Sequence, residues 1–158
     1  MIIHTGDIWT ADTDLVLVAT NSTIKRNGTL VMGAGSALEA TIVIPEIAHM
    51  FAKWIDNKEI YHLVVDPSWP GPTSVCIGGI QSKTSYRLNS SLELVQDSLL
   101  ALSRFAALHS EYRIDTVAPG IGLGNLSKRK VLEFAATVLP GNVHVWLSLA
   151  KDHPRTNG

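Results

Sequence analysis

The chain contains 158 residues, of which 46% are hydrophobic and 17% charged, and its formal net charge is −1 at pH 7. This length can bury a sizeable core, and so apolar a composition argues against a disordered chain. A charge so close to zero argues against nonspecific nucleic-acid binding, and no apolar run reaches the roughly 18 residues of a membrane-spanning helix.

The apolar pattern predicts strands and helices that alternate along the chain. Strands are expected at residues 1–4, 14–20, 61–65, 74–80, 115–118 and 143–149. Helices are expected at residues 36–41, 45–55, 90–108 and 127–138. Pro45 suits the first turn of its helix. Ser90 with Glu93 forms a capping box at the head of the longest helix.

Strands that alternate with helices imply an α/β fold, with a layered sheet and helices on both faces. We expect one domain over residues 1–150 and a flexible polar tail over residues 151–158. Cys76 is the only cysteine, which excludes an internal disulfide. The segment Met1–Asp7 lacks the basic start and cleavage pattern of a signal peptide, so we expect a cytoplasmic protein with no membrane partner.

Two glycine-rich loops each follow a predicted strand. Met32-Gly33-Ala34-Gly35-Ser36 comes after the apolar run 15–19, and Gly120–Asn125 comes after the run 116–118. Glycine lets backbone N–H groups approach a ligand, and the helix start behind each loop favours an anion. One such loop alone is weak evidence, because turns also require glycine. The pair, at the carboxyl ends of strands, predicts a clamp on a diphosphate.

Other kinds of chemistry have less support in the sequence. The histidines show no metal-ligand spacing, so no metal site is expected. A Walker A motif is missing, and the strand 143–149 has no acidic residue for dinucleotide binding, so no cofactor is expected. A solvated helix face explains the basic triplet Lys128-Arg129-Lys130 better than a nucleic-acid contact does.

Several motifs together resemble the macro domain family, and their order along the chain is the order typical of it. They are Gly6-Asp7-Ile8, Asp14–Ser22, Met32–Gly35 and Gly122–Asn125. The branch that contains bacterial DNA ADP-ribosyl glycohydrolase antitoxins is especially similar. Its typical segments here are Met32–Leu38, Pro45-Glu46, and Ser82–Arg87 followed by Ser90. The resemblance covers nearly the whole chain and implies a three-layer α/β/α fold with a mixed, mostly parallel central sheet.

The resemblance also implies an ADP-ribose site. Asp7 would accept a hydrogen bond from the adenine amino group beside the Ile8 N–H, and Asn21 would face the distal ribose. Each has a structural alternative, because Asp7 suits a cap and Asn21 suits a turn after a strand. Backbone N–H groups of both glycine-rich loops would wrap the phosphates. The implied ligand-binding residues are Gly6, Asp7, Ile8, Asn21, Ser22, Gly33, Ala34, Gly35, Ser36, Gly122, Leu123, Gly124 and Asn125.

Lys83 is the candidate catalytic residue, since a lysine here in the similar branch acts at the anomeric carbon of the distal ribose. A desolvated lysine can lose its proton and act as a nucleophile, although an exposed lysine at a strand end looks the same in sequence. The chain departs from that branch in a shorter second loop, where Ser127 stands at the position of an acidic residue. Serine cannot act as a carboxylate acid or base near neutral pH, and Ser127 suits a helix N-cap.

The main expected function is therefore binding of ADP-ribose or a related nucleotide, free or attached to nucleic acid or protein. The alternative is an ADP-ribosyl glycohydrolase that uses Lys83, with Asp66 or a water molecule in place of the missing acid. Whether the chain is an enzyme stays open at this point, and a scaffold that has lost its ligand is a third interpretation. We expect a monomer.

Overall fold

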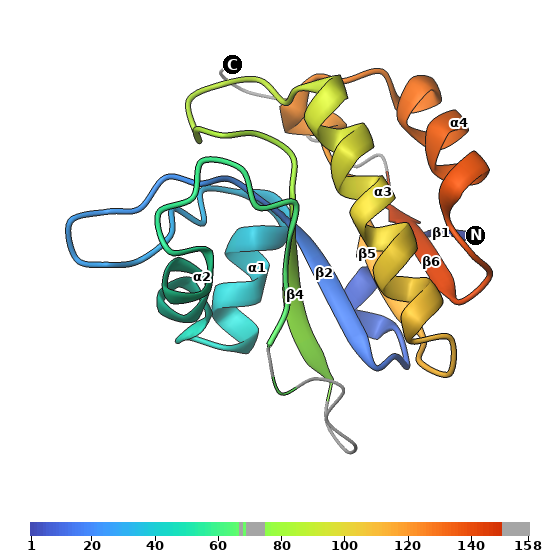
Figure 1. Cartoon of the computed structure of the whole chain (residues 1–158), viewed down its shortest axis with the longest axis horizontal. Coiled ribbons are helices and arrows are strands. Elements are labelled where there is room, and N and C mark those ends of the chain that lie inside the picture. Colours follow the sequence, from blue (N-terminus) through green and yellow to red (C-terminus); the bar gives the residue numbers. More distant parts are fainter. Residues whose placement is uncertain (67, 69–74, 150–158) are drawn as a thin grey trace.

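The computed structural model describes residues 1–66, 68 and 75–149. Within these residues, a central sheet lies between two layers of helices (Figure 1). The strands are β1 (Ile2–Thr5), β2 (Leu15–Thr20), β3 (Leu63–Val64), β4 (Cys76–Gln81), β5 (Ile114–Val117) and β6 (Val143–Leu147). The helices are α1 (Gly35–Val43), α2 (Ile47–Ile55), α3 (Leu92–Leu108) and α4 (Lys128–Val138), with short 3-10 turns η1 (Ile8–Thr10) and η2 (Gly122–Gly124).

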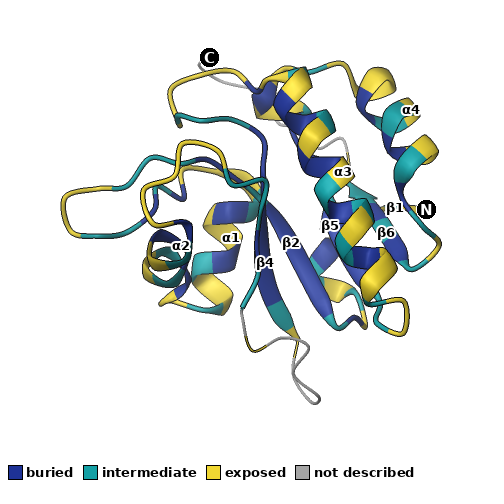
Figure 2. Cartoon of the chain, in the orientation of Figure 1, coloured by how far each residue is buried: buried dark blue, intermediate teal, exposed yellow. Residues whose placement is uncertain are grey.

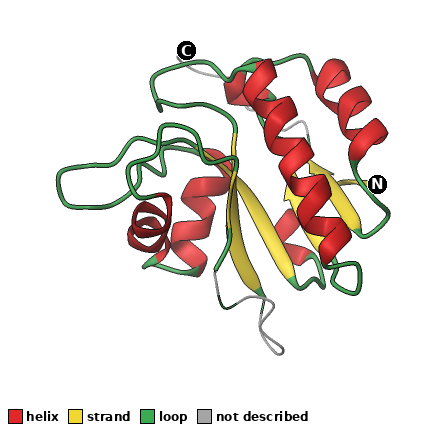
Figure 3. Ribbon diagram, viewed as in Figure 1, coloured by secondary structure: helices red, strands yellow, loops and turns green. Residues whose placement is uncertain are grey.

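The described strands form one six-stranded sheet in the order β1-β6-β5-β2-β4-β3. Neighbouring strands are parallel except for β3 and β4, which are antiparallel. Helices cover both faces of this sheet (Figure 3). The predicted three-layer α/β/α fold with a mixed, mostly parallel sheet is therefore confirmed.

Strand β2 lies inside the sheet and is buried on both faces (Figure 2). Leu15 and Leu17 belong to the core shared with α3 and α4. Val16 and Val18 belong to the second core, shared with α1 and α2. A strand covered on both faces needs apolar side chains at successive positions, which explains why this part of the sequence is continuously apolar.

Several element boundaries differ from the predicted ones. β3 contains only Leu63–Val64, and it begins after His62, whose left-handed φ of 64° interrupts an extended strand. Ser91, rather than Ser90, caps α3, and its side chain accepts a hydrogen bond from the Leu94 amide. The predicted capping box at Ser90 is therefore wrong by one position.

The first two helices also begin or end elsewhere than predicted. α1 continues to Val43, and its buried residues Ala37 and Ala40 pack in the second core. α2 begins at Ile47 rather than at Pro45, after a turn in which the Ile47 amide donates to the Ile44 carbonyl. The predicted tail, residues 151–158, lies outside the described residues. In the described ranges, no helix has the length and apolarity needed to cross a membrane.

Candidate functional site

The carboxyl ends of β2, β4 and β5 lie at one edge of the sheet, because these neighbouring strands are parallel. We call this the carboxyl edge; it lies at the top of Figure 1. Here the Ser22 amide donates to the Thr84 carbonyl, and the Ser90 amide donates to the Gly124 carbonyl, both at 3.0 Å. Lys83 and both predicted glycine-rich loops therefore occupy the same edge.

The first glycine-rich loop presents an exposed helix start. Gly33, Ala34 and Gly35 are exposed, and Gly35 has a φ of 61°, a conformation that favours glycine. The N-cap residue of α1, Ala34, provides no side-chain cap for its first turn. The Ser36 hydroxyl oxygen accepts a hydrogen bond from the Ala19 amide at 3.3 Å, which ties this helix start to the end of β2. An uncapped helix start at the carboxyl edge suits an anion.

The second glycine-rich loop forms the turn η2. Gly122 and Leu123 are exposed, and a Cβ at Gly122 would meet nothing within 4 Å. Gly124 is buried against Ser90. The Asn125 amide already donates to the Gly122 carbonyl at 3.0 Å, inside the turn. The Gly122 and Leu123 amides are therefore better placed for a phosphate than the Asn125 amide, and their contact with a ligand stays a prediction.

Asp7 serves as the N-cap of η1. Its carboxylate accepts a hydrogen bond from the Trp9 amide at 3.0 Å, which confirms the cap interpretation. The Trp9 indole in turn donates to Glu39 on α1 at 2.5 Å, linking η1 to the helix behind the first glycine-rich loop. Asp7 is exposed, and a carboxylate accepts several hydrogen bonds at once, so the cap leaves it capacity for an adenine amino group. The adenine contacts of Gly6, Asp7 and Ile8 stay predictions.

Asn21 and Ser22, at the end of β2, take part in internal hydrogen bonds. The Asn21 side chain is buried; it donates to the Val31 carbonyl at 2.9 Å and accepts from the Thr23 amide at 2.8 Å. The Ser22 hydroxyl donates to the Glu59 carbonyl at 2.7 Å. Both side chains hold the loop that follows β2, and their contact with a ribose stays a prediction.

Gln81 organises the end of β4, and sequence analysis missed it. Its side chain is fully buried, and its amide nitrogen donates to the Ser22 hydroxyl at 2.7 Å and to the Lys83 carbonyl at 3.2 Å. The Gln81 side-chain oxygen accepts a hydrogen bond from the Tyr61 amide at 2.9 Å. Tyr61 itself is buried, and this burial raises the pKa of its hydroxyl well above the ordinary value. The sequence feature that could have identified Gln81 is its position as a single amide side chain at the end of an apolar strand.

Lys83 lies just after β4 and is half-buried. Within residues 1–66, 68 and 75–149, no hydrogen bond or ion pair holds its ammonium group. The Ser127 hydroxyl accepts a hydrogen bond from the Lys130 amide at 3.3 Å, so Ser127 is the N-cap of α4, as predicted. Residue 127 therefore caps a helix and offers no carboxylate that could act as an acid or base.

Asp66 is badly placed to replace the missing acid. It follows β3, which runs antiparallel to β4, so Asp66 lies toward the amino end of β4 whereas Lys83 follows its carboxyl end. Hydrogen bonds from the Ser68 hydroxyl and amide hold the pKa of the Asp66 carboxyl below its ordinary value. The expectation that Asp66 could act with Lys83 is therefore wrong.

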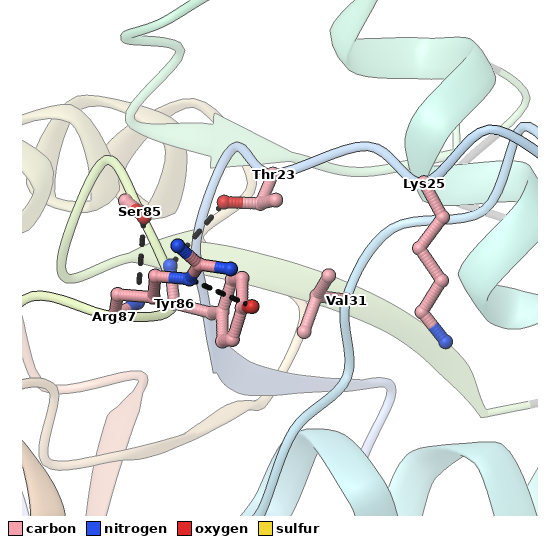
Figure 4. Close-up of a pocket in the computed structure, with 6 residues that line it drawn as sticks. All are labelled: Thr23, Lys25, Val31, Ser85, Tyr86 and Arg87. Carbon is pink, nitrogen blue, oxygen red and sulfur yellow. Dashed lines mark hydrogen bonds between the residues drawn. The ribbon is translucent and has the colours of Figure 1, made fainter.

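A hollow of about 550 Å³ opens beside the Lys83 segment (Figure 4). The Tyr86 amide donates to the Thr23 hydroxyl at 3.3 Å, joining the two segments that line it. The Arg87 guanidinium donates to the Tyr86 hydroxyl at 2.9 Å and lies 5.4 Å from the centre of that ring. Sequence analysis assigned no role to Arg87 or Lys25, which give the hollow its positive charge. The lining residues are Thr23, Lys25, Val31, Ser85, Tyr86 and Arg87.

A cluster on β1, β5 and β6 has the donor atoms of a metal site. Ligand atoms of His4, Asp115 and His144 lie within 4.8 Å of one another. Two observations favour a hydrogen bond between the two histidines over a bound metal ion at this cluster. His4 Nε2 and His144 Nδ1 are 2.7 Å apart in nearly parallel rings, so they already form a hydrogen bond. Arg113 donates to both Asp115 oxygens, at 2.9 and 3.0 Å, which compensates that charge.

Comparison with known proteins shows similarity in structure. No protein-family model matches the chain, and no curated protein sequence matches it. The macrodomain of Thermus aquaticus DarG is 22% identical, with a TM-score of 0.75 over 93% of this chain and 96% of that one. The macrodomain of Mycobacterium tuberculosis DarG is 21% identical, with a TM-score of 0.70 over 92% and 95% of the two chains.

A third solved structure, Thermosipho africanus DarTG in complex with ADP-ribose, is 19% identical, with a TM-score of 0.75. The match covers 97% of this chain and 43% of the Thermosipho africanus chain. At such identities the likeness concerns the fold. The sheet order, the two helical layers and these structural matches agree: the chain has the macrodomain fold and resembles the DarG macrodomains.

Proposed function

We propose that the chain binds ADP-ribose at the carboxyl edge, either free or attached to a macromolecule. The observation that carries this proposal is the placement of the uncapped start of α1 and the exposed turn η2 on neighbouring parallel strands. Each presents backbone N–H groups suited to one end of a diphosphate. Two solved structures of similar fold, Thermosipho africanus DarTG and a Trypanosoma brucei macrodomain, are complexes with ADP-ribose.

The remaining groups of the edge suit the other parts of this ligand. Asp7 offers an exposed acceptor for the adenine amino group, beside α1. Asn21 and Lys83 lie at the ends of β2 and β4, where the distal ribose would lie. The hollow beside Lys83 gives space for a group attached to that ribose. Free and macromolecule-attached ADP-ribose are thus both compatible with the edge.

Titration calorimetry with ADP-ribose tests the proposal. We expect saturable heat, and a ligand at about 100 times its dissociation constant should add roughly 2.7 kcal/mol of stability. For a domain of this size that raises the melting temperature by about 5–10 °C. Wild-type protein with neither heat nor a melting shift would contradict the proposal.

A charge variant locates the diphosphate. A Cβ at Gly33 would meet only Val31, at 3.9 Å, so Gly33→Asp is compatible with the fold and places a carboxylate at the first loop. We expect repulsion to weaken ADP-ribose binding by about tenfold or more. Gly141→Asp is the matched control, because its Cβ also has open space and it precedes β6, away from the carboxyl edge. Equal losses in the two variants would reject the location.

The second candidate function is ADP-ribosyl glycohydrolase activity with Lys83. The half-buried lysine beside the hollow favours it, and the N-cap role of Ser127 opposes it. Turnover of ADP-ribosylated oligonucleotide and ADP-ribosylated protein separates the candidates. An enzyme should lose turnover in Lys83→Ala while that variant still binds ADP-ribose. Equal turnover in wild type and variant removes the role of Lys83, and no turnover in wild type leaves the binding function alone.

A further inference from the structure

Ser90 fills the space beside the second glycine-rich loop. It is buried, and its amide donates to the Gly124 carbonyl at 3.0 Å. A Cβ built on Gly124 would lie 3.0 Å from the Ser90 Cβ and would overlap its hydroxyl oxygen. A Cβ on Gly120 would lie 3.2 Å from the same Ser90 Cβ. Sequence analysis assigned the glycine at position 124 to ligand approach, and the structure gives a second reason for it, because a side chain there would overlap Ser90.

Asn89 adds a second contact to the same turn. The Asn125 side-chain amide donates to the Asn89 side-chain oxygen, Oδ1, at 2.9 Å. Asn125 has a left-handed φ of 62° and ends η2. Two successive residues of one segment, Asn89 and Ser90, therefore hold two successive residues of the other, Gly124 and Asn125.

The segment 82–91, which we call the bridging segment, is equally tied at its other end. The Ser82 amide donates to the Thr20 carbonyl at 3.0 Å, and the Thr84 carbonyl accepts from the Ser22 amide at 3.0 Å. The bridging segment thus leaves the end of β4, is tied to the end of β2 and reaches η2 along the carboxyl edge (Figure 1).

We propose that Ser90 and Asn89 are positioning residues for ADP-ribose binding. Neither needs to touch the ligand; together they set the orientation of η2, and with it the Gly122 and Leu123 amides. This inference rests on the proposed function, because it assigns a task to η2 that only a diphosphate ligand requires. It predicts that Ser90 and Gly124 form a matched pair whose sizes must be changed together.

A compensating pair of substitutions tests this match. Gly124→Ala should weaken ADP-ribose binding by about tenfold or more, because its Cβ displaces the turn from Ser90. Ser90→Gly in the same chain removes both overlapping atoms and should restore the affinity to within about threefold of wild type. Gly141→Ala, which adds a Cβ in open space outside the site, should bind like wild type. Unchanged binding by Gly124→Ala, or no recovery in the folded double variant, would overturn the proposal.

The asparagine pair gives a test that does not depend on the glycine variant folding. Both side chains are exposed, and glycine at position 125 keeps the left-handed backbone, so Asn89→Ala and Asn125→Gly should leave the melting temperature without ligand nearly unchanged. Each variant should weaken ADP-ribose binding by about fivefold, and the double variant by the same factor, because the two side chains act as one unit. Losses that multiply, or no loss in Asn89→Ala, would show that Asn89 does not act through the turn.

The controls separate failure of this inference from failure of the proposed function. If wild type shows no saturable heat with ADP-ribose, the proposed function fails, and the positioning role fails with it. If wild type binds and all variants bind alike, only the positioning role fails. Variants that melt at lower temperature but keep wild-type affinity indicate a purely structural role and also overturn it.

Discussion

Individual polar residues at the carboxyl edge already serve the fold, whatever else they bind. Asn21 is the clearest case, because its buried amide makes hydrogen bonds to the Val31 carbonyl and the Thr23 amide. These bonds close the loop between β2 and α1. A change at Asn21 therefore acts on the loop as well as on any ligand, and the two effects need separate measurements.

We predict that Asn21→Ala lowers the free energy of unfolding by about 1–3 kcal/mol, because it removes a buried side chain whose hydrogen bonds hold the half-buried Val31 carbonyl and Thr23 amide. Urea unfolding without ligand measures this loss. Asn27→Ala is the control in the same loop; Asn27 is exposed and its side chain bonds to Thr29, so we expect a loss of about 0.5 kcal/mol or less. Similar losses in the two variants would contradict the assignment.

At the level of whole elements, contacts between segments select the residue that ends a helix. Ser90 and Ser91 both offer a hydroxyl before α3, and the predicted capping box used Ser90. The Ser90 amide instead donates to the Gly124 carbonyl, and Ser91 caps the helix. The contact with η2 therefore moves the cap by one residue without altering the helix that follows.

Ser91→Ala should destabilise the protein by about 1 kcal/mol, the usual cost of losing an N-cap side chain. Ser127→Ala should cost a similar amount, since Ser127 caps α4 in the same way. Thermal unfolding measures both. A neutral Ser91→Ala would show that the cap of α3 lies elsewhere.

Strand β4 has a glycine where neighbouring elements approach too closely for a side chain. A Cβ on Gly78 would lie 2.7 Å from the Val64 carbonyl oxygen and 2.8 Å from the Leu17 side chain. We predict that Gly78→Ala lowers the free energy of unfolding by about 1–3 kcal/mol through overpacking. Chemical unfolding gives the value, and Gly141→Ala, which meets nothing within 4 Å, should stay within about 0.5 kcal/mol of wild type.

Across the whole molecule, a polar cluster joins the first strand to two strands far along the chain. Arg113 and Asp115 pair beside β5, and the Trp146 indole on β6 donates to Asp115 at 2.6 Å. The His4 ring on β1 stacks on Trp146 and bonds to His144. Burial, and then the charge of Arg113, lowers the pKa of His144; the Asp115 charge partly offsets this, and His4 and the chain amino terminus add to it.

This arrangement predicts a pH dependence of stability. The unfolded chain binds a proton at His144 near pH 6.5, whereas the folded protein binds it only at lower pH. The unfolded state therefore takes up the proton first, and the free energy of unfolding should fall as pH decreases from about 7 through 6. The fall should stop once the folded protein is protonated as well.

Unfolding in urea at several pH values measures this effect, with His144→Gln expected to reduce the fall. His49→Gln is the control, because His49 is exposed on α2 and should leave the pH dependence as in wild type. A wild-type free energy that is constant between about pH 7 and 5.5, or an unchanged fall in His144→Gln, would contradict the prediction.

The layered fold could be predicted because the apolar patterns of strands and helices extend over many residues and recur along the chain. The apolar run of β2 and the helical spacing in α3 each report burial over many residues. Ser127 was predicted as a cap from its residue type and position, and it is one. Boundaries failed where a single distant contact or an unusual backbone angle intervened, as at Ser90 and at His62.

The candidate site was predictable as a set of loops and much less as a set of contacts. Parallel strands bring both glycine-rich loops and Lys83 to one edge, as the alternation of strands and helices suggested. The pattern could not show that Gln81 anchors the Lys83 segment, or that Asp66 lies toward the other edge. Those facts depend on the antiparallel β3 and on buried hydrogen bonds, which leave little trace in residue order.

Residue order alone established the alternating elements and the two glycine-rich loops, because periodicity and turn chemistry act over neighbouring residues. The order of the sequence motifs carried the resemblance to macro domains. Packing between distant segments decided which groups stay open to a ligand. It committed the Asn21 side chain to a loop and the Asn125 amide to a turn. A hydrogen-bond donor is open only when no other part of the folded chain has taken it, and that depends on the position of every neighbouring segment.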